Sequence, residues 1–169
     1  ALKDYHALER LCLNAVRMTA DGLQVLCEAL VDHPKLLMLD VGCYKSAADL
    51  HEVTNNLGFK GAFLLAEFIR KNKSVRILDL RTCHLAAEGL AMIADAAETN
   101  TTLCYIYAEQ MGLRTMQSRL ALHRIASICN RNCQAAGFQD LQDYCSHYLR
   151  QEKHTAKVVH IDSIYRNNM

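Results

Sequence analysis

Short apolar stretches recur along the chain. Each reads L-x-x-L-x-L, with other aliphatic residues at some of the leucine positions, and they begin at Leu8, Leu36, Val75 and Leu103. Alternating apolar and polar positions over a few residues predict a half-buried β-strand. The starts are 28, 39 and 28 residues apart, so the middle spacing is one 28-residue period with an 11-residue insertion. The sequence therefore predicts four strands that belong to an internal repeat.

A helical pattern follows each of the first three strands and begins near a glycine, at Gly22, Gly61 and Gly89. Apolar residues three or four positions apart then predict a helix with one buried stripe. These residues include Leu23, Leu26 and Leu30 in the first unit and Leu90, Ile93 and Ala97 in the third. Two of the helices lead into polar segments, at 72–74 and 100–102, before the next strand. The repeating unit is thus strand, turn and helix.

This unit resembles the ribonuclease-inhibitor type of leucine-rich repeat, in which units of about 28 residues carry a full outer helix. The resemblance covers residues 8–130. It implies an α/β fold: a right-handed leucine-rich-repeat solenoid, or short horseshoe, with a parallel concave sheet, outer helices and a C-terminal helical cap. The sequence departs from the family pattern at the turn and in the fourth repeat, where Gln117 stands at the place of the glycine. The turn residue that is normally Asn or Cys is Cys83 in the third repeat, but Val16, Tyr44 and Met111 elsewhere.

The predicted organisation divides the chain after residue 130. Residues 1–130 hold four repeats with the insertion in the second, and residues 131–169 form a C-terminal helical cap and a tail. The last repeat of such an array exposes an apolar face that a cap must cover. Gly137 and Phe138 open a helical pattern that continues to Tyr148, so the cap helix is expected within 131–153.

The residues between the leucines of each strand are expected to point to the concave side, because side chains alternate along a strand. They predict three cross-strand rows: Arg10, Met38, Ile77 and Tyr105; Cys12, Asp40, Asp79 and Tyr107; and Asn14, Gly42, Arg81 and Glu109. Tyrosine, arginine and methionine are enriched in protein interfaces. All of these residues except Cys12 and Gly42 are therefore the predicted partner-binding set. In the alternative interpretation, Tyr105 and Tyr107 only cover the last strand beneath the cap.

The insertion within residues 44–56 is a second candidate for partner binding, because loops that interrupt a repeat often carry function. A helical turn around Leu50 and His51 would present an apolar and a polar side chain near the concave edge. The alternative is a loop without a role.

Candidate chemistry is sparse. Cys129 and Cys133 are four residues apart on a predicted helix, with Cys145 and His147 further along, so chelation of zinc is geometrically feasible. The simpler interpretation of these cysteines is that they are small apolar side chains packed in the core of a cap helix. Asp40 and Asp79 would lie about 5 Å apart on neighbouring strands, but an open sheet face offers no pocket that excludes water. The prediction is therefore a protein that is not an enzyme and has no cofactor or metal.

The charge balance and hydropathy of the chain argue against nucleic acid and membranes as partners. The chain has 19 basic and 18 acidic residues, so it carries no strong field that would favour nucleic acid. No apolar run approaches the roughly 20 residues that a membrane span needs. The eight cysteines fall mostly where an apolar residue would serve, which suggests reduced thiols and a cytoplasmic location.

The predicted function is a protein-protein interaction module that binds a protein partner through the concave face and the 44–56 loop, and regulates or inhibits it. Two alternatives stay open. The first is a GTPase-activating or regulatory protein of leucine-rich-repeat type. The second is the sensing segment of a larger receptor, ligase or bacterial effector, which in the last case would act in the host cytosol.

Overall fold

A computed structural model describes residues 2–43, 53–110 and 113–139 of the 169-residue chain. After a short 3-10 helix, η1 (Leu2–Asp4), strands and helices alternate along the described residues. The strands are β1 (Arg10–Cys12), β2 (Met38–Asp40), β3 (Ile77–Asp79) and β4 (Tyr105–Tyr107). The helices are α1 (Ala20–Leu30), α3 (Gly58–Lys71), α4 (Ala87–Glu98) and α5 (Met116–Ala135).

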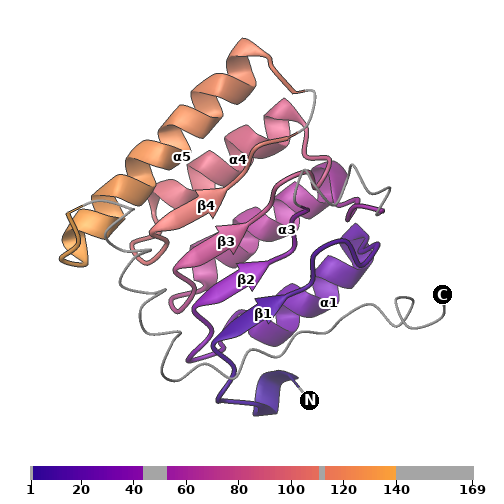
Figure 1. Ribbon diagram of the computed structural model, residues 1–169, viewed down its shortest axis with the longest axis vertical. Coiled ribbons are helices and arrows are strands. Elements are labelled where there is room, and N and C mark those ends of the chain that lie inside the picture. Colours follow the sequence, from indigo (N-terminus) through magenta and orange to yellow (C-terminus); the bar gives the residue numbers. More distant parts are fainter. Residues whose placement is uncertain (1, 44–52, 111–112, 140–169) are drawn as a thin grey trace.

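The strands form one parallel sheet in chain order, and the helices cover one of its faces (Figure 1). The central residues of the strands are buried in the same core as the helices, and they are Leu11, Leu39, Leu78 and Ile106. Their neighbours in each strand point the other way, to the side that we call the open face. The observed pairing joins Arg10, Met38, Ile77 and Tyr105 in one row and Cys12, Asp40, Asp79 and Tyr107 in the next. These two predicted rows are confirmed.

Glycine allows α3 and α4 to pack closely. A Cβ atom added at Gly89 would lie 2.8 Å from the Cβ of Ala62, which is closer than unbonded carbon atoms approach. A Cβ atom added at Gly61 would lie 2.5 Å from that of Leu57, at the start of α3. The repeated glycine is therefore required at these two positions by packing, and not by an unusual backbone angle.

Buried asparagines link successive helix ends on the way back to the sheet. The Nδ2 of Asn100 donates to the carbonyl of Ile69 at 2.8 Å, and its Oδ1 accepts from the backbone N–H of Leu103 at 2.8 Å. Asn72 makes the equivalent contacts one unit earlier, to Leu30 and Val75. Asn132 donates to the backbone carbonyls of residues 100 and 103. These side chains satisfy backbone groups that the helix ends leave unpaired.

A second set of side chains closes the turns that follow the strands. Asn55 is fully buried, and it donates to the carbonyls of Leu13 and Val41 while accepting from two backbone N–H groups. Cys83 donates to the carbonyl of Val41, and Gln110 donates to that of Leu80. The prediction placed Val16, Tyr44 and Met111 at this turn position. Val16 donates its backbone N–H to Asn55, while Tyr44 and Met111 lie outside the described residues. Asn55 precedes Cys83 by one 28-residue period. The 11-residue insertion of the second repeat therefore lies before Asn55 in the sequence.

Helix α5 crosses the predicted domain boundary at residue 130 and ends at Ala135. Gly137 follows with a φ of 88°, a left-handed conformation that favours glycine and commonly ends helices. The expected helical pattern from Phe138 onward lies almost wholly outside the described residues, so the cap at 131–153 stays a prediction.

The expected horseshoe solenoid is not what the structure shows. The described residues form a small two-layer α/β domain of four parallel strands and four helices. A solenoid gains its curvature from small rotations that add up over many repeats. Here each strand is three residues long, and the 20-residue helix α5 packs on the last strand and on α4. No helix in the described part of the chain is long and apolar enough to cross a membrane.

Candidate functional site

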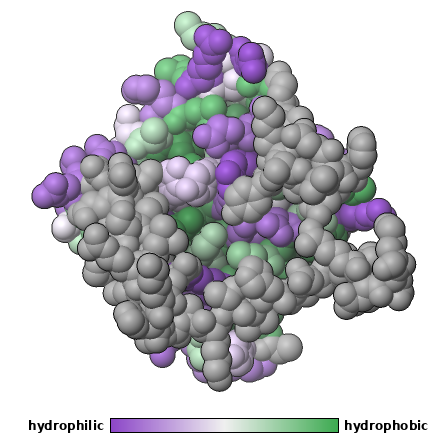
Figure 2. Space-filling model, in the orientation of Figure 1, coloured by the Kyte–Doolittle hydropathy of each residue, from purple (hydrophilic) through white to green (hydrophobic). Residues whose placement is uncertain are grey.

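The open face of the sheet is the candidate site, because it carries most of the residues that the sequence predicted for binding. Figure 2 shows apolar and polar side chains next to one another on this side of the molecule. Among the predicted residues, Asn14 and Glu109 are exposed. Five are half-buried: Arg10, Met38, Arg81, Tyr105 and Tyr107. The structure thus brings the strand residues together, while the loop residues Leu50 and His51 lie outside the described part.

Three predicted residues of this face are buried. Asp40 and Asp79 are each 2% exposed, and Ile77 is 8% exposed. Ile77 packs with Cys104 and Cys133, and the partly buried Phe138 packs against the same cluster. Sequence reasoning missed Phe138 as a part of this face, because the segment after Gly137 was interpreted as the start of another helix. The glycine itself was the available signal that the chain turns there.

The two aspartates hold the backbone where the strands end. Asp40 Oδ1 accepts from the N–H of Gly42 at 3.0 Å, and Asp79 Oδ1 accepts from the N–H of Arg81 at 3.0 Å. A Cβ atom at Gly42 would lie 2.4 Å from Asp79 Oδ1, so glycine permits this close approach. The two carboxylates thus fix the backbone of the turns at the ends of the strands. They support the open face without direct contact with a partner.

Arg81 connects the aspartates to the aromatic side chains. Its Nε lies 3.0 Å from each carboxylate oxygen of Asp79, and its terminal nitrogen also pairs with that carboxylate. The guanidinium carbon lies 4.5 Å from the centroid of the Tyr107 ring, which is a cation–π contact. Tyr105 and Tyr107 meet edge to face, with ring centroids 3.8 Å apart and an interplanar angle of 76°. Ion pairing and ring contacts therefore fix the tyrosines in place before any partner binds.

Asp40 differs from Asp79 because no arginine pairs with it among the described contacts. Burial and the neighbouring charge of Asp79 raise the pKa of Asp40 to about 6. The hydrogen bond from Gly42 and the more distant Arg81 oppose this shift. The folded protein therefore takes up a proton at Asp40 more readily than the unfolded chain does.

We expect Asp40→Asn to stabilise the protein at pH 7.5 by up to about 3 kcal/mol, because Asp40 is ionised in the folded protein above about pH 6 and its buried charge is unfavourable there. The amide oxygen still accepts from Gly42. As the pH falls from 6 toward about 4, Asp40 of the native protein is protonated, and the advantage of the variant should disappear. Urea unfolding at several pH values measures this. Asp79→Asn is the matched control and should destabilise, since it breaks the ion pair with Arg81.

The described cysteines give no sign of a metal centre. Cys129 and Cys133, the first half of the predicted constellation, are both buried, and burial raises the pKa of the Cys129 thiol to about 12. A protonated thiol is a poor ligand for zinc, which binds the thiolate. Cys145 and His147 lie outside the described residues. Within those residues, no group of three or more His, Cys, Asp or Glu side chains could hold an ion.

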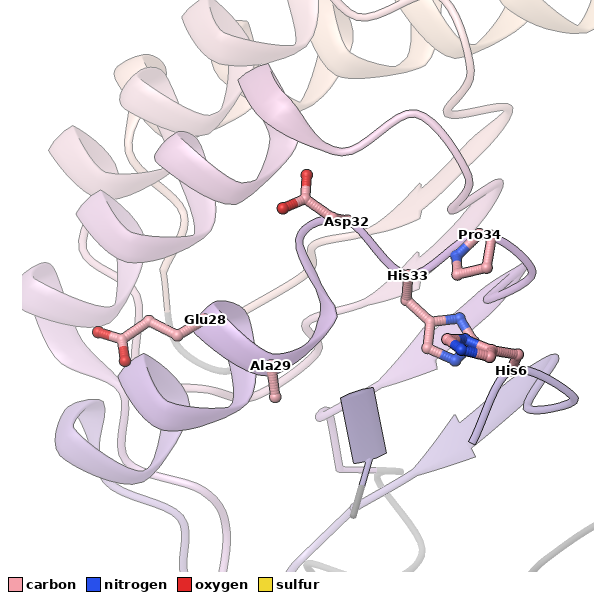
Figure 3. A pocket seen from close by; sticks show the side chains of 6 residues that line it. All are labelled: His6, Glu28, Ala29, Asp32, His33 and Pro34. Atoms are coloured by element: carbon pink, nitrogen blue, oxygen red, sulfur yellow. The ribbon is translucent and has the colours of Figure 1, made fainter. Parts of the chain in front are cut away.

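A shallow pocket at the β1 edge of the domain is lined by His6, Glu28, Asp32 and His33, and the carboxylate of Glu28 points away from the two histidine rings (Figure 3). His33 is buried, and both of its ring nitrogens have backbone partners. Its Nε2 lies 3.1 Å from the Tyr5 carbonyl, and its Nδ1 accepts from the N–H of Lys35. His33 thus anchors the N-terminal segment at the position where the later units have asparagine, which favours a structural role.

No family model matches the sequence, and a comparison with curated protein sequences finds no match. A comparison of folds does. The domain titled leiomodin-1 actin-binding site 2 (ABS2) matches with a TM-score of 0.62 and 14% identity, over 91% of this chain and 94% of that one. The fold is that of the leiomodin-1 domain. The C-terminal domain of tropomodulin from Caenorhabditis elegans has a TM-score of 0.47 and 18% identity, over 90% of this chain and 94% of that one.

The leiomodin-1 match corrects the assignment to leucine-rich repeats of the ribonuclease-inhibitor type. The solved structure whose fold this chain shares is the leiomodin-1 domain, and the solenoid assignment is wrong. The physical reason is that L-x-x-L-x-L describes only a short strand with one buried side, followed by a turn and a helix. Any domain with parallel strands and helices on one face can satisfy that pattern, so it predicts the local unit without identifying the family.

Proposed function

We propose that this chain is a protein-binding domain whose partner docks on the open face of the sheet, and that actin is the first partner to test. The fold likeness to a domain titled an actin-binding site supports the choice of actin. The open face supports the location, since it presents half-buried tyrosine and arginine side chains between the exposed Asn14 and Glu109. These residue types dominate the energetics of protein interfaces.

The rigidity of the open face favours binding. Ordering flexible side chains reduces affinity by about 0.5–1.5 kcal/mol for each one immobilised. Arg81 is already held by Asp79, and it in turn contacts the Tyr107 ring. A partner that docks on Tyr105 and Tyr107 therefore meets side chains that have lost much of their freedom beforehand. Regulation of the partner would follow from covering part of its surface.

We favour binding over catalysis at this face. The cross-strand pair Asp40 and Asp79 is the nearest approach to a pair of catalytic carboxylates, and both side chains are 2% exposed. Each also accepts a backbone hydrogen bond at a strand end. These hydrogen bonds give Asp40 and Asp79 a structural role, which explains why two carboxylates lie side by side here.

Binding to actin is tested by sedimentation of the full chain with actin filaments, and by fluorescence anisotropy of the labelled chain with monomeric actin. We expect saturable binding to at least one form of actin. Binding to neither form would remove actin as the partner. Binding that persists after substitution of the open-face tyrosines would place the contact elsewhere on the domain.

A further inference from the structure

The middle of the open face is buried, although the described helices cover the other side of the sheet (Figure 1). Asp40 and Asp79 are each 2% exposed, and Ile77 is 8% exposed. Parallel sheets are usually covered on both faces. A carboxylate that points away from the helices is buried this deeply only when other atoms lie above it. The burial therefore indicates that the open face has a cover.

The chain leaves the described residues on this same face. At the end of α5 the left-handed turn at Gly137 reverses the backbone, and the N–H of Phe138 donates to the carbonyl of Cys133 at 3.1 Å. Phe138 packs against the cluster that contains Ile77 of β3 and Cys104. The turn thus brings the chain from the helical layer to the β3 and β4 side of the open face, and residues 140–169 follow from there.

The sequence that follows has the length and the pattern to cross this face. Apolar or aromatic residues recur at helical spacing, at Phe138, Leu141, Cys145 and Tyr148, so they share one side of a helix. Ten residues of helix beyond Phe138 extend about 15 Å. The distance from β4 to β1 is three strand spacings, or about 14 Å. One helix from Phe138 to Tyr148 therefore matches the width of the sheet.

The charges select this segment over the rest of the C-terminal residues. Residues 138–149 contain two aspartates and neither lysine nor arginine, while residues 150–169 contain four basic and two acidic residues. The open face carries the half-buried cations Arg10 and Arg81. Its own two carboxylates accept backbone hydrogen bonds at the strand ends. An acidic segment is therefore better matched to this face than a basic one.

We propose that residues 140–149 lie as a helix across the open face, with Leu141, Cys145 and Tyr148 on the sheet, and that this helix must leave before a protein partner docks. The second part rests on the proposed function, in which the partner uses the same face. This arrangement differs from a cap at the end of the repeats, because the helix covers the strands and not the edge beyond β4. A partner then binds only those chains whose open face is uncovered. If one chain in about ten is uncovered, the apparent affinity is about tenfold weaker.

Photocrosslinking within the full chain tests where the segment lies, without any partner. A diazirine side chain of similar size replaces Met38, which is half-buried on β2 at the middle of the face. We expect crosslinks within one chain to residues 141–149, located by tandem mass spectrometry after digestion. The same side chain at Val25, on α1, should give none. Crosslinks from position 38 that reach only other residues, such as Phe138, would overturn the proposal. Crosslinks between two chains would also overturn it, because they assign the face to a second copy.

Variants of the segment test whether its apolar stripe holds it on the sheet. Leu141→Glu and Tyr148→Glu each place a charge against the face, which is unfavourable without a partner for that charge. Both should reduce the crosslink yield from position 38 at least about fivefold. Ser146→Glu is the matched control, since it adds the same charge away from the stripe, and it should keep the wild-type yield. Equal yields in all three variants would contradict the proposed orientation. Thermal unfolding verifies that each variant is folded.

Actin binding by the same variants tests the regulatory part. Leu141→Glu and Tyr148→Glu should bind about tenfold more tightly than the wild type, and Ser146→Glu should bind as the wild type does. If the crosslink forms and no variant binds actin, actin is the wrong partner, and the position of the segment is still supported. If the crosslink forms and all variants bind actin equally, the segment does not hinder the partner, and the regulatory part is wrong.

Discussion

Replacing Tyr105 and Tyr107 together with alanine is expected to weaken binding of the protein partner at least tenfold. Both rings lie on the open face, half-buried and in contact with each other. Truncating a central aromatic side chain of an interface typically reduces binding by about 2 kcal/mol or more. The variant also removes the ring under the Arg81 guanidinium, so that arginine loses its fixed position. Titration of labelled protein with actin measures the change.

Tyr5→Ala is the matched control, because this tyrosine is 51% exposed on the N-terminal segment, outside the strands. It should bind as the wild type does. The double variant should keep its circular-dichroism spectrum and most of its thermal stability. A collapse of the fold would show that Tyr105 and Tyr107 are core residues beneath the end of α5, where Phe138 packs against the same cluster. That outcome would contradict their assignment to binding.

Asn100→Ala is expected to lower the free energy of unfolding by about 3–5 kcal/mol, the largest loss of stability we predict. The side chain is 1% exposed, donates to the carbonyls of Ile69 and Asn72, and accepts from two backbone N–H groups. Alanine leaves these groups buried without partners, and each unsatisfied group destabilises the fold by about 1–3 kcal/mol. Urea unfolding measures the difference.

Thr101→Ala tests the same turn without the buried contacts, because Thr101 is exposed. It should change stability by less than about 0.5 kcal/mol. If Asn100→Ala were equally mild, water or a shifted backbone would be satisfying the freed groups. The asparagines at the helix ends would then not be what joins one unit to the next.

The strands could be predicted from the sequence because their leucines alternate with outward residues, and the 28-residue period fixes how neighbouring strands pair. The observed register joins Leu11 to Leu39 and Leu78 to Ile106. One feature of the fold could not be predicted in this way. Asn55 bonds to backbone atoms up to 42 residues away, which no local pattern shows. The sequence shows that Asn55 is equivalent to Cys83, one period later, only when the 11-residue insertion is placed before Asn55 in the alignment of the repeats.

The candidate site was predicted less completely than the fold. Alternation assigns Asp40, Ile77 and Asp79 to the open face, but it does not reveal what lies over them, and all three are buried. Ile77 is covered in part by residues from the end of α5, and that contact depends on the left-handed turn at Gly137. The pattern also could not distinguish a leucine-rich-repeat solenoid from this two-layer domain, because a strand, a turn and a helix are shared by many domains.

Site-specific photocrosslinking tests most directly whether a protein partner docks on the open face. A photoreactive residue at Asn14 or at Glu109 lies at an exposed position on that face, and one at Val25 lies on α1 at the helical side. With actin bound, we expect crosslinks from the first two positions and none from Val25. Crosslinks from Val25 alone would contradict the account and place the partner on the helices.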